Sequence, residues 1–180
     1  ANWQCACCRC CFARRPAPVH TSYLGYPGTM GADFIDYIIA DAIIIPEGAE
    51  RHYSEKIARL PGCYQANDGT RAIAPLSPAR AESGLPENGF VFCCFNNNYK
   101  ITPNTFDGWM RILGKAEGSV LWLLAEDYDV ERNLRQEAAS RGVDAERLIF
   151  AQRMSLPEHL ARHRLADLFV DTLPYNAHTT

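Results

Sequence analysis

Residues 89–102, GFVFCCFNNNYKIT, constrain the fold of this chain more than any other stretch. The continuous apolar run at 90–95 is typical of a strand buried on both faces of a parallel sheet. This run ends abruptly in three asparagines and a lysine, and Thr102 and Pro103 then open a helical pattern. Ligands of α/β proteins bind at such positions, outside the carboxyl ends of parallel strands. The stretch therefore predicts a parallel α/β sheet with a binding site at its carboxyl edge.

Two side chains at this strand end are candidates for binding an anion. Asn97 and Lys100 are expected at the rim of the sheet, where an amide and an ammonium group suit a phosphate. The alternative is an ordinary solvated loop in which Lys100 points into water. The stretch alone leaves both interpretations open.

The rest of the second half alternates between strand and helix patterns. The strands predicted from apolar runs are 89–95, 119–124, 147–151 and 167–171. The helices expected after them are one from Pro103 with Thr102 as its cap, 130–140 and 156–164. The first helix is expected to bury Phe106, Trp109, Met110 and Leu113, and the last helix is expected to turn Leu156 and Leu160 inward. This alternation indicates a parallel sheet with right-handed crossovers.

The first half is predicted to contain fewer elements. Strands are expected at 17–24 and 36–40. Apolar residues spaced as on one helix face predict a helix over 50–60, with Glu55 as an ordinary surface charge. Residues 62–88, rich in Pro, Gly, Ser, Asn and Asp, are expected to connect two halves of the chain rather than to pack as an element.

Composition and charge narrow the class of protein. The 180 residues are 47% hydrophobic and 22% charged, as in a globular protein. A net charge of −3 gives no general attraction to nucleic acids or anionic membranes. The longest apolar run falls far short of the roughly 20 residues that a membrane-spanning helix needs. We therefore expect no nucleic-acid or membrane partner.

The eight cysteines raise the question of a metal site. Five of them lie within residues 5–11, but no second cluster of Cys or His follows to complete four zinc ligands. We therefore expect no bound metal, reduced thiols and a cytoplasmic location.

Two other patterns with metal-ligand spacing have simpler interpretations. Asp127 and Asp129 stand in a polar loop that enters a helix, where capping is expected. His159 and His163 lie four residues apart without the glutamate of a zinc-protease motif. We expect this histidine pair on the solvated surface.

Several blocks of the sequence are similar to a known family. They are RPAPVHTSYLGYPGTMGADFIDYIIAD at 15–41, YSEKIARLP at 53–61, FCCFNNNYKITP at 92–103, SVLWLL at 119–124 and LARHRLADLFVDTLPYNAHTT at 160–180. These blocks resemble the catalytic region of the TPR-containing O-GlcNAc transferases of bacteria and eukaryotes. The resemblance runs from about Phe12 to Thr180, and residues 1–11 fall outside it.

This resemblance implies a fragment of a two-lobed glycosyltransferase of the GT-B type, truncated at both ends. Each lobe of that fold is a Rossmann-like parallel sheet, and the nucleotide-sugar lies in the cleft between the lobes. Residues 12–61 would be the end of the first lobe, 62–88 a linker, and 89–180 the beginning of the second lobe, which binds the nucleotide-sugar. Residues 1–11 are expected to be unstructured.

The resemblance also implies roles for residues around the donor. The residues expected at the donor diphosphate are Asn97, Lys100, His178, Thr179 and Thr180. Those expected around the uridine are Met154, Leu156, His159 and Arg162, although Leu156 departs from the lysine that some members have at its position. The loop expected to face the donor sugar consists of Leu24, Gly25 and Tyr26.

The activity that the resemblance implies is a metal-independent, inverting transfer of N-acetylglucosamine from UDP-GlcNAc to serine or threonine of acceptor proteins, without a cofactor. The general base and the TPR region that recruits acceptors are expected upstream of residue 1. No catalytic residue is therefore assigned, and the 180-residue chain by itself is expected to be inactive. The alternatives are a sister glycosyltransferase that uses GDP-fucose or UDP-glucose, and a non-catalytic nucleotide-binding module.

Overall fold

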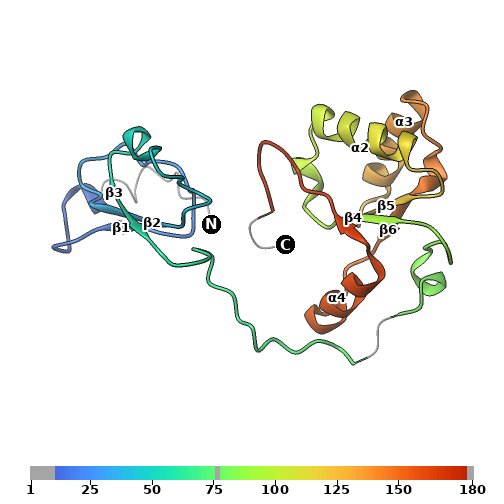
Figure 1. Cartoon of the computed structure of the whole chain (residues 1–180), viewed down its shortest axis with the longest axis horizontal. Coiled ribbons are helices and arrows are strands. Elements are labelled where there is room, and N and C mark those ends of the chain that lie inside the picture. The colour runs from blue at the N-terminus through green and yellow to red at the C-terminus, as the bar shows by residue number, and fades with distance from the viewer. Residues whose placement is uncertain (1–10, 76–77, 178–180) are drawn as a thin grey trace. The chain divides into compact units, whose positions relative to one another are not determined.

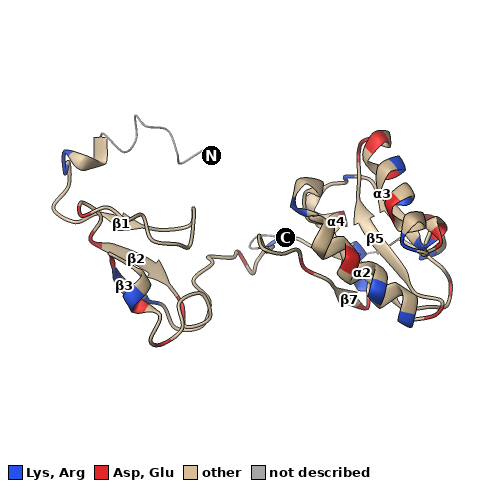
Figure 2. Cartoon of the chain, turned by 90° about the horizontal axis from the view of Figure 1, so that it is seen from above, with Lys and Arg blue, Asp and Glu red and all other residues tan. Residues whose placement is uncertain are grey.

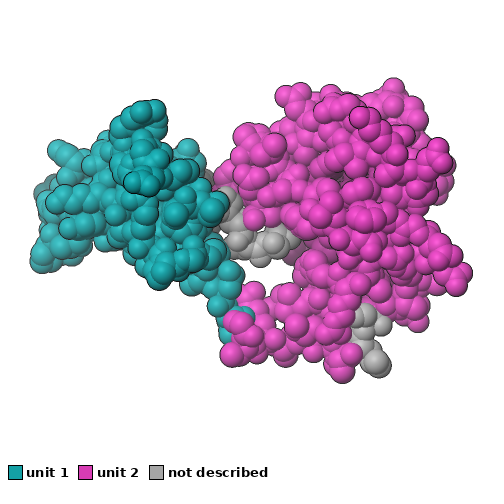
Figure 3. Space-filling view, in the orientation of Figure 1, with its two compact units in different colours: residues 1–68 teal, residues 69–180 magenta. Residues whose placement is uncertain are grey.

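The computed structural model describes residues 11–75 and 78–177 of the chain. The chain divides into two compact units, residues 1–68 and 69–180, and each contains a sheet of its own (Figure 1 and Figure 3). The described strands pair in parallel in both sheets. The parallel α/β fold predicted from the sequence is therefore confirmed.

The sheet of the second unit has the strand order β6-β5-β4-β7. Its strands are β4 (Val91–Cys94), β5 (Val120–Leu124), β6 (Leu148–Ala151) and β7 (Leu168–Phe169). These four strands contain no charged residue, and the charged residues of the unit gather on its helices and loops (Figure 2). All four strands predicted from apolar runs are confirmed, with narrower bounds.

Helices cover both faces of this sheet. They are α2 (Pro103–Lys115), α3 (Tyr128–Ser140) and α4 (Leu156–Arg162). In Figure 1, α2 and α3 lie on one side of the sheet and α4 lies on the other. Within β4, Phe92 and Cys94 pack in the core cluster that includes α2 residues, whereas Val91 and Cys93 belong to the cluster on the opposite face. Because both faces are covered, β4 is a continuous apolar run rather than an alternating one.

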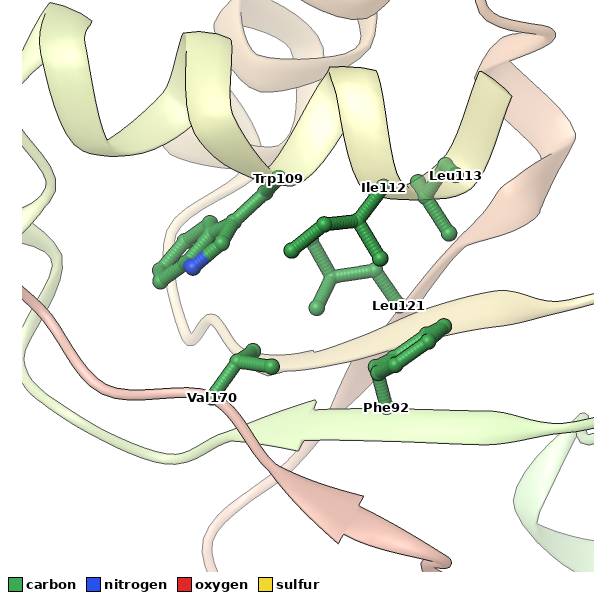
Figure 4. Close-up of a pocket in the computed structure, with 6 residues that line it drawn as sticks. All are labelled: Phe92, Trp109, Ile112, Leu113, Leu121 and Val170. Carbon is green, nitrogen blue, oxygen red and sulfur yellow. The ribbon is translucent and has the colours of Figure 1, made fainter. Parts of the chain in front are cut away.

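Helix α2 begins and packs as predicted. The Oγ1 of Thr102 accepts a hydrogen bond from the backbone N–H of Thr105 at 3.3 Å, and Pro103 occupies the first helical position. The four predicted core residues are all buried: Phe106, Trp109, Met110 and Leu113. Figure 4 shows the apolar gap below this helix, lined by Phe92, Trp109, Ile112, Leu113, Leu121 and Val170. The gap has no room for a water molecule, so it is a core contact rather than a ligand pocket.

The starts of α3 and α4 are also fixed by capping side chains. Asp127 accepts a hydrogen bond from the backbone N–H of Asp129 at 2.8 Å and caps α3, as predicted. Ser155 and Glu158 form a capping box at the start of α4. The expectation that Leu156 turns inward is wrong, because this side chain is 49% exposed. Leu156 is only the first residue of α4, and the face that packs on the sheet carries Ala161 and Arg162 one turn and more further along.

The first unit has a smaller sheet with the order β1-β2-β3. Its strands are β1 (Thr21–Ser22), β2 (Tyr37–Ala40) and β3 (Lys56–Arg59). The predicted strand at 36–40 is confirmed, and β1 covers only part of the strand predicted at 17–24. A small cluster of buried apolar residues supports this sheet: Ile38, Ala40 and Ile45.

The helix predicted over 50–60 is wrong. Only Glu50–His52 form a 3-10 turn, and Lys56–Arg59 form β3, which pairs in parallel with β2. The apolar spacing that suggested a helix face does not describe a buried stripe, because Leu60 is 40% exposed. Pairing with β2 supplies backbone hydrogen bonds along this segment, and that long-range contact outweighs the local pattern.

The predicted connection at 62–88 has ends that pack on different units. The backbone N–H of Tyr64 donates to Asp41 at 2.8 Å in the first unit, and Leu85 joins a core cluster of the second. Along the chain, the boundary between the two units falls between Asp68 and Gly69. The lobe boundaries inferred from the family resemblance stay a prediction.

Among the described residues, no helix has the length and hydrophobicity that crossing a bilayer requires.

Candidate functional site

Lys100 lies at the carboxyl edge of the second sheet, against the segment that follows β7. It ends the 3-10 turn Asn98–Lys100 after β4. Its Nζ donates a hydrogen bond to the carbonyl oxygen of Asn176 at 3.2 Å and lies 4.8 Å from the ring centroid of Tyr175. Lys100 is therefore half-buried on a neighbouring turn and does not simply point into water, which was the alternative left open by the sequence.

Asp171 organises the turn that Lys100 contacts. Its carboxylate accepts hydrogen bonds from the backbone N–H groups of Thr172 at 2.7 Å and Ala177 at 2.8 Å. The side-chain amides of Asn176 and Asn96 also donate to it, each at 3.2 Å. Partial burial acts to raise the pKa of Asp171, but these hydrogen bonds outweigh it and hold the pKa below its usual value. A carboxylate thus closes the turn from residue 172 to residue 177.

Asn96 ties this turn to the end of β4. Its Nδ2 donates to Thr172 Oγ1 at 2.9 Å, and that hydroxyl donates to the Tyr175 carbonyl at 2.7 Å. Asn96 is 2% exposed, whereas Asn97, the residue singled out from the sequence, is exposed. Asn97 places its carbonyl 3.0 Å from the backbone N–H of Lys100, which closes the 3-10 turn.

Sequence reasoning missed Asn96 and Asp171. The available signal was positional, because each is a polar residue at the end of a predicted strand and the two strands are neighbours in the sheet. His178, Thr179 and Thr180, expected at the diphosphate, lie outside the described residues. The structure places the segment up to Ala177 beside Lys100.

His159 and Arg162, the histidine and arginine expected at the uridine, both pack against the ring of Phe95. The ring centroid of His159 is 5.4 Å from that of Phe95 and 4.7 Å from that of His163. The guanidinium carbon of Arg162 lies 4.4 Å from the Phe95 centroid, and the residue is only 1% exposed. The expectation of a solvated histidine pair is wrong, since both rings are half-buried against Phe95.

The charge state of His159 follows from this setting. Burial, followed by the nearby charges of Arg162 and His163, lowers the pKa of His159 to about 4. The imidazole is therefore neutral at neutral pH. A neutral ring beside an apolar neighbour suits stacking on a flat ligand such as a nucleobase. Met154 and Leu156, expected at the same site, are exposed near the start of α4.

Phe95 connects the two groups of candidates. It follows β4 directly and contacts the histidines of α4 and the 3-10 turn His163–Leu165. Lys100 follows five residues later and contacts the turn after β7. The structure thus brings Lys100, His159 and Arg162 to segments around the carboxyl end of β4. In the described residues, no group of three or more His, Cys, Asp or Glu side chains is arranged to hold a metal ion.

The loop expected to face the donor sugar belongs to the first unit and follows β1. Leu24 adopts a positive φ of 52°, which is rare for a residue other than glycine. Leu24 and Tyr26 are exposed, with 42% and 62% of their surfaces accessible. The side chains of Leu24 and Tyr26 are therefore accessible to a ligand.

Two residues next to β3 hold this loop. Tyr53 donates its hydroxyl hydrogen to the Pro27 carbonyl at 3.0 Å. Glu55 accepts from Thr29 Oγ1 at 2.8 Å and from the backbone N–H of Met30 at 2.7 Å. The expectation of Glu55 as a surface charge is wrong, because it is 5% exposed. The sequence analysis missed this role because it placed Glu55 on the exposed face of the helix that was wrongly predicted at 50–60.

The family model for glycosyl transferase family 41 matches residues 6–78 and 73–180. The chain belongs to glycosyl transferase family 41. The first matched range begins at residue 6, within the segment 1–11 that the sequence resemblance left out. Membership of this family confirms the resemblance and the assignment to the glycosyltransferases.

Similar proteins agree with this family. A relative from Arabidopsis thaliana, named as the probable UDP-N-acetylglucosamine–peptide N-acetylglucosaminyltransferase SEC, is 41% identical over 174 residues, 94% of this chain and 18% of the relative. A relative from Solanum lycopersicum, named as the probable UDP-N-acetylglucosamine–peptide N-acetylglucosaminyltransferase SPINDLY, is 35% identical over 93% of this chain and 18% of its own length.

A solved structure supports the fold as well. A mutant O-GlcNAc transferase from Thermobaculum terrenum matches 92% of this chain and 31% of that protein, with a TM-score of 0.76 and 32% identity. The predicted GT-B-like α/β fold is thereby confirmed for the part that this chain spans. The chain covers less than a third of each of these proteins.

Proposed function

We propose that this chain is part of a protein O-GlcNAc transferase, which moves N-acetylglucosamine from UDP-GlcNAc to serine or threonine hydroxyls of proteins. The observation that carries the proposal is the contact of Lys100 with the turn after β7. This contact places the ammonium group of Lys100 beside the turn at 172–177, at the carboxyl edge of a parallel sheet. Nucleotide ligands bind at this edge in α/β proteins. The relatives that match most of this chain are named as N-acetylglucosaminyltransferases, and these names support the proposed reaction.

Each group of residues has a part in this proposal. Lys100 and Asn97, with His178, Thr179 and Thr180, hold the donor diphosphate. His159 stacks on the uracil, Met154 and Leu156 border the same pocket, and Arg162 supports it from behind through its contact with His159. Leu24, Gly25 and Tyr26 face the donor sugar. Neutral His159 and half-buried Lys100 support this division, because one suits an aromatic base and the other an anion.

The proposed chemistry places negative charge where Lys100 is held. In an inverting transfer the acceptor hydroxyl oxygen bonds to the anomeric carbon while the bond from that carbon to the β-phosphate oxygen breaks. The electron pair leaves with UDP, and the hydroxyl proton passes to a base that we expect upstream of this chain. A fixed ammonium group stabilises the leaving diphosphate as its charge develops. We propose that this needs no metal or cofactor, in line with the use of Asp127 as a helix cap.

The proposed partners follow from the reaction. They are a nucleotide-sugar donor and acceptor proteins, recruited by a TPR region in the longer protein, with no nucleic acid and no membrane. A cytoplasmic location is proposed as well, supported by the unpaired thiols Cys11, Cys63, Cys93 and Cys94 among the described residues.

The test is a calorimetric titration of the 180-residue chain with UDP and with GDP. We expect UDP to bind more tightly than GDP, and Lys100→Met to weaken UDP binding by about tenfold or more through loss of a charge-assisted contact. Lys115→Met, which removes an exposed lysine at the end of α2, is the matched control and should leave the affinity unchanged.

Three outcomes count against the proposal. Absence of UDP binding would remove its basis. Preference for GDP would reverse the choice of donor, and equal affinities of the Lys100→Met variant and the wild-type chain would show that Lys100 has no phosphate contact.

A further inference from the structure

The guanidinium of Arg162 is buried, and both of its terminal nitrogens have hydrogen-bond partners, whereas its Nε has none. Its Nη1 donates to the Gln152 carbonyl at 2.7 Å, and its Nη2 lies 2.6 Å from Nδ1 of His159. Its guanidinium carbon lies 4.4 Å from the ring centroid of Phe95 and 5.8 Å from that of Trp122. With 1% of its surface exposed, Arg162 has little access to a ligand in solution.

This contact dictates how protons are arranged on His159. A guanidinium carries only donors, so Nδ1 of His159 must accept the hydrogen bond with its lone pair. The remaining proton of the neutral ring then lies on Nε2. Protonation of Nδ1 would place two N–H groups and two positive charges against each other, and Arg162 therefore opposes it.

A second contact fixes the backbone of the same residue. His163 Nδ1 lies 2.7 Å from the carbonyl oxygen of His159, and a carbonyl only accepts, so this nitrogen is the donor. Phe95 packs against the ring from the end of β4. Arg162 and His163 are the charged or titratable groups that affect the charge state of His159 in the described part of the chain.

We propose that Arg162 is a positioning residue that holds His159 as the neutral tautomer with its proton on Nε2. The ring then offers an uncharged face and a single N–H donor at the carboxyl edge of β4. A ligand that fits these two features is a flat heterocycle with a carbonyl acceptor at its edge. For the uracil of the donor, this consequence rests on the proposed function, and Arg162 acts on the base through His159.

Nitrogen NMR of the chain with ¹⁵N-labelled histidine tests the tautomer directly, without any nucleotide. Long-range ¹H–¹⁵N spectra at neutral pH should show His159 Nδ1 unprotonated and Nε2 protonated, and the ring should titrate near 4. A His159→Gln variant assigns the signals among the five histidines. A protonated Nδ1 in the wild-type chain, or titration near the ordinary value of 6.5, would overturn the proposal.

Variants separate positioning from a merely structural role. Arg162→Met should give a mixture of both tautomers and move the His159 pKa toward 6.5. Arg162→Lys should keep the pKa of His159 low, because a positive charge stays beside the ring. His159 Nδ1 should nevertheless carry a proton in part of the molecules, since an ammonium group lacks the planar, paired donors of a guanidinium. Arg164→Met, at an exposed neighbouring position, is the control and should leave the His159 signals unchanged. An unchanged tautomer in a folded Arg162→Met variant would refute the proposal, and if that variant does not fold, the wild-type spectrum alone decides.

The consequence for the donor has a separate measurement. Titration of the labelled chain with UDP should shift His159 Nε2 more than the nitrogens of His20 or His52, which lie in the first unit. Shifts of equal size at all three histidines would refute the stated role of the Nε2–H donor. If UDP does not bind at all, the proposed function fails, whereas the tautomer measured without nucleotide still stands or falls by its own spectrum.

Discussion

The side-chain amide of Asn96 donates to Thr172 Oγ1 across 2.9 Å, and both residues are buried. Asn96 follows β4 and Thr172 follows β7, so this hydrogen bond joins the ends of two neighbouring parallel strands. The same amide reaches Asp171, which closes the turn that Lys100 contacts. The carboxyl edge of the sheet is thus held by a connected polar network, in which the loss of one member leaves others without partners.

Replacing Asn96 should therefore destabilise the second unit. Asn96→Ala removes the donor to Thr172 and Asp171, and we expect a loss of about 1–3 kcal/mol in the free energy of unfolding. Urea unfolding followed by fluorescence of Trp109 and Trp122, in a Trp3→Phe background, measures it. The control is Asn97→Ala at the exposed neighbour, for which a change within about 0.5 kcal/mol is expected. Equal losses in the two variants would contradict the network.

The depressed pKa of Asp171 predicts how this unit responds to acid. Its folded pKa lies below 3.8, so the ionised carboxylate adds stability above that value, and the contribution is lost as the pH falls through the folded pKa. Asp171→Asn removes this dependence. The difference in unfolding free energy between the wild-type chain and the variant should therefore shrink as the pH is lowered below 3.8.

The same tryptophan fluorescence, recorded over a pH series, measures this difference. Asp33→Asn serves as the control, because Asp33 is an exposed carboxyl in the first unit and does not touch the turn. A wild-type-to-variant difference for Asp171 that stays constant down to the lowest pH would show that the hydrogen bonds to its carboxylate contribute nothing.

Glu55 should control the order of the loop at 25–31. In Glu55→Gln, one acceptor oxygen becomes an amide donor that faces either Thr29 or the N–H of Met30. We expect the first unit to lose about 1–3 kcal/mol and amide hydrogens of this loop to exchange faster. Hydrogen exchange read by mass spectrometry measures the loop, and Glu47→Gln, at an exposed position, is the control. Unchanged exchange in the Glu55→Gln variant would show that the loop is held by other contacts.

Local and long-range information explain which features could be predicted. The strand at 89–95 and helix α2 carry their own signals, namely an apolar run, a capping threonine and a proline at the first helical position. Segment β3 does not, because its conformation depends on pairing with β2, and the burial of Glu55 follows from that pairing. The structural role of Asn96 was missed for a similar reason, whereas the place of Asn97 at the diphosphate stays a prediction. Which of two adjacent amides turns inward depends on the position of Thr172, 76 residues away.

The cap of α2 offers a test that joins local signal and site. Thr102 Oγ1 accepts from the Thr105 N–H at the start of α2 and also donates to the Leu173 carbonyl, 3.2 Å away in the turn after β7. Thr102→Ala should lose about 1 kcal/mol from the missing cap, whereas the Leu173 carbonyl keeps its hydrogen bond from Thr105 Oγ1 at 2.9 Å. Thr102→Ser keeps the hydroxyl and should recover most of this stability. Urea unfolding measures both variants, and a serine variant as unstable as the alanine variant would show that the methyl group of Thr102, rather than its hydroxyl, stabilises this junction.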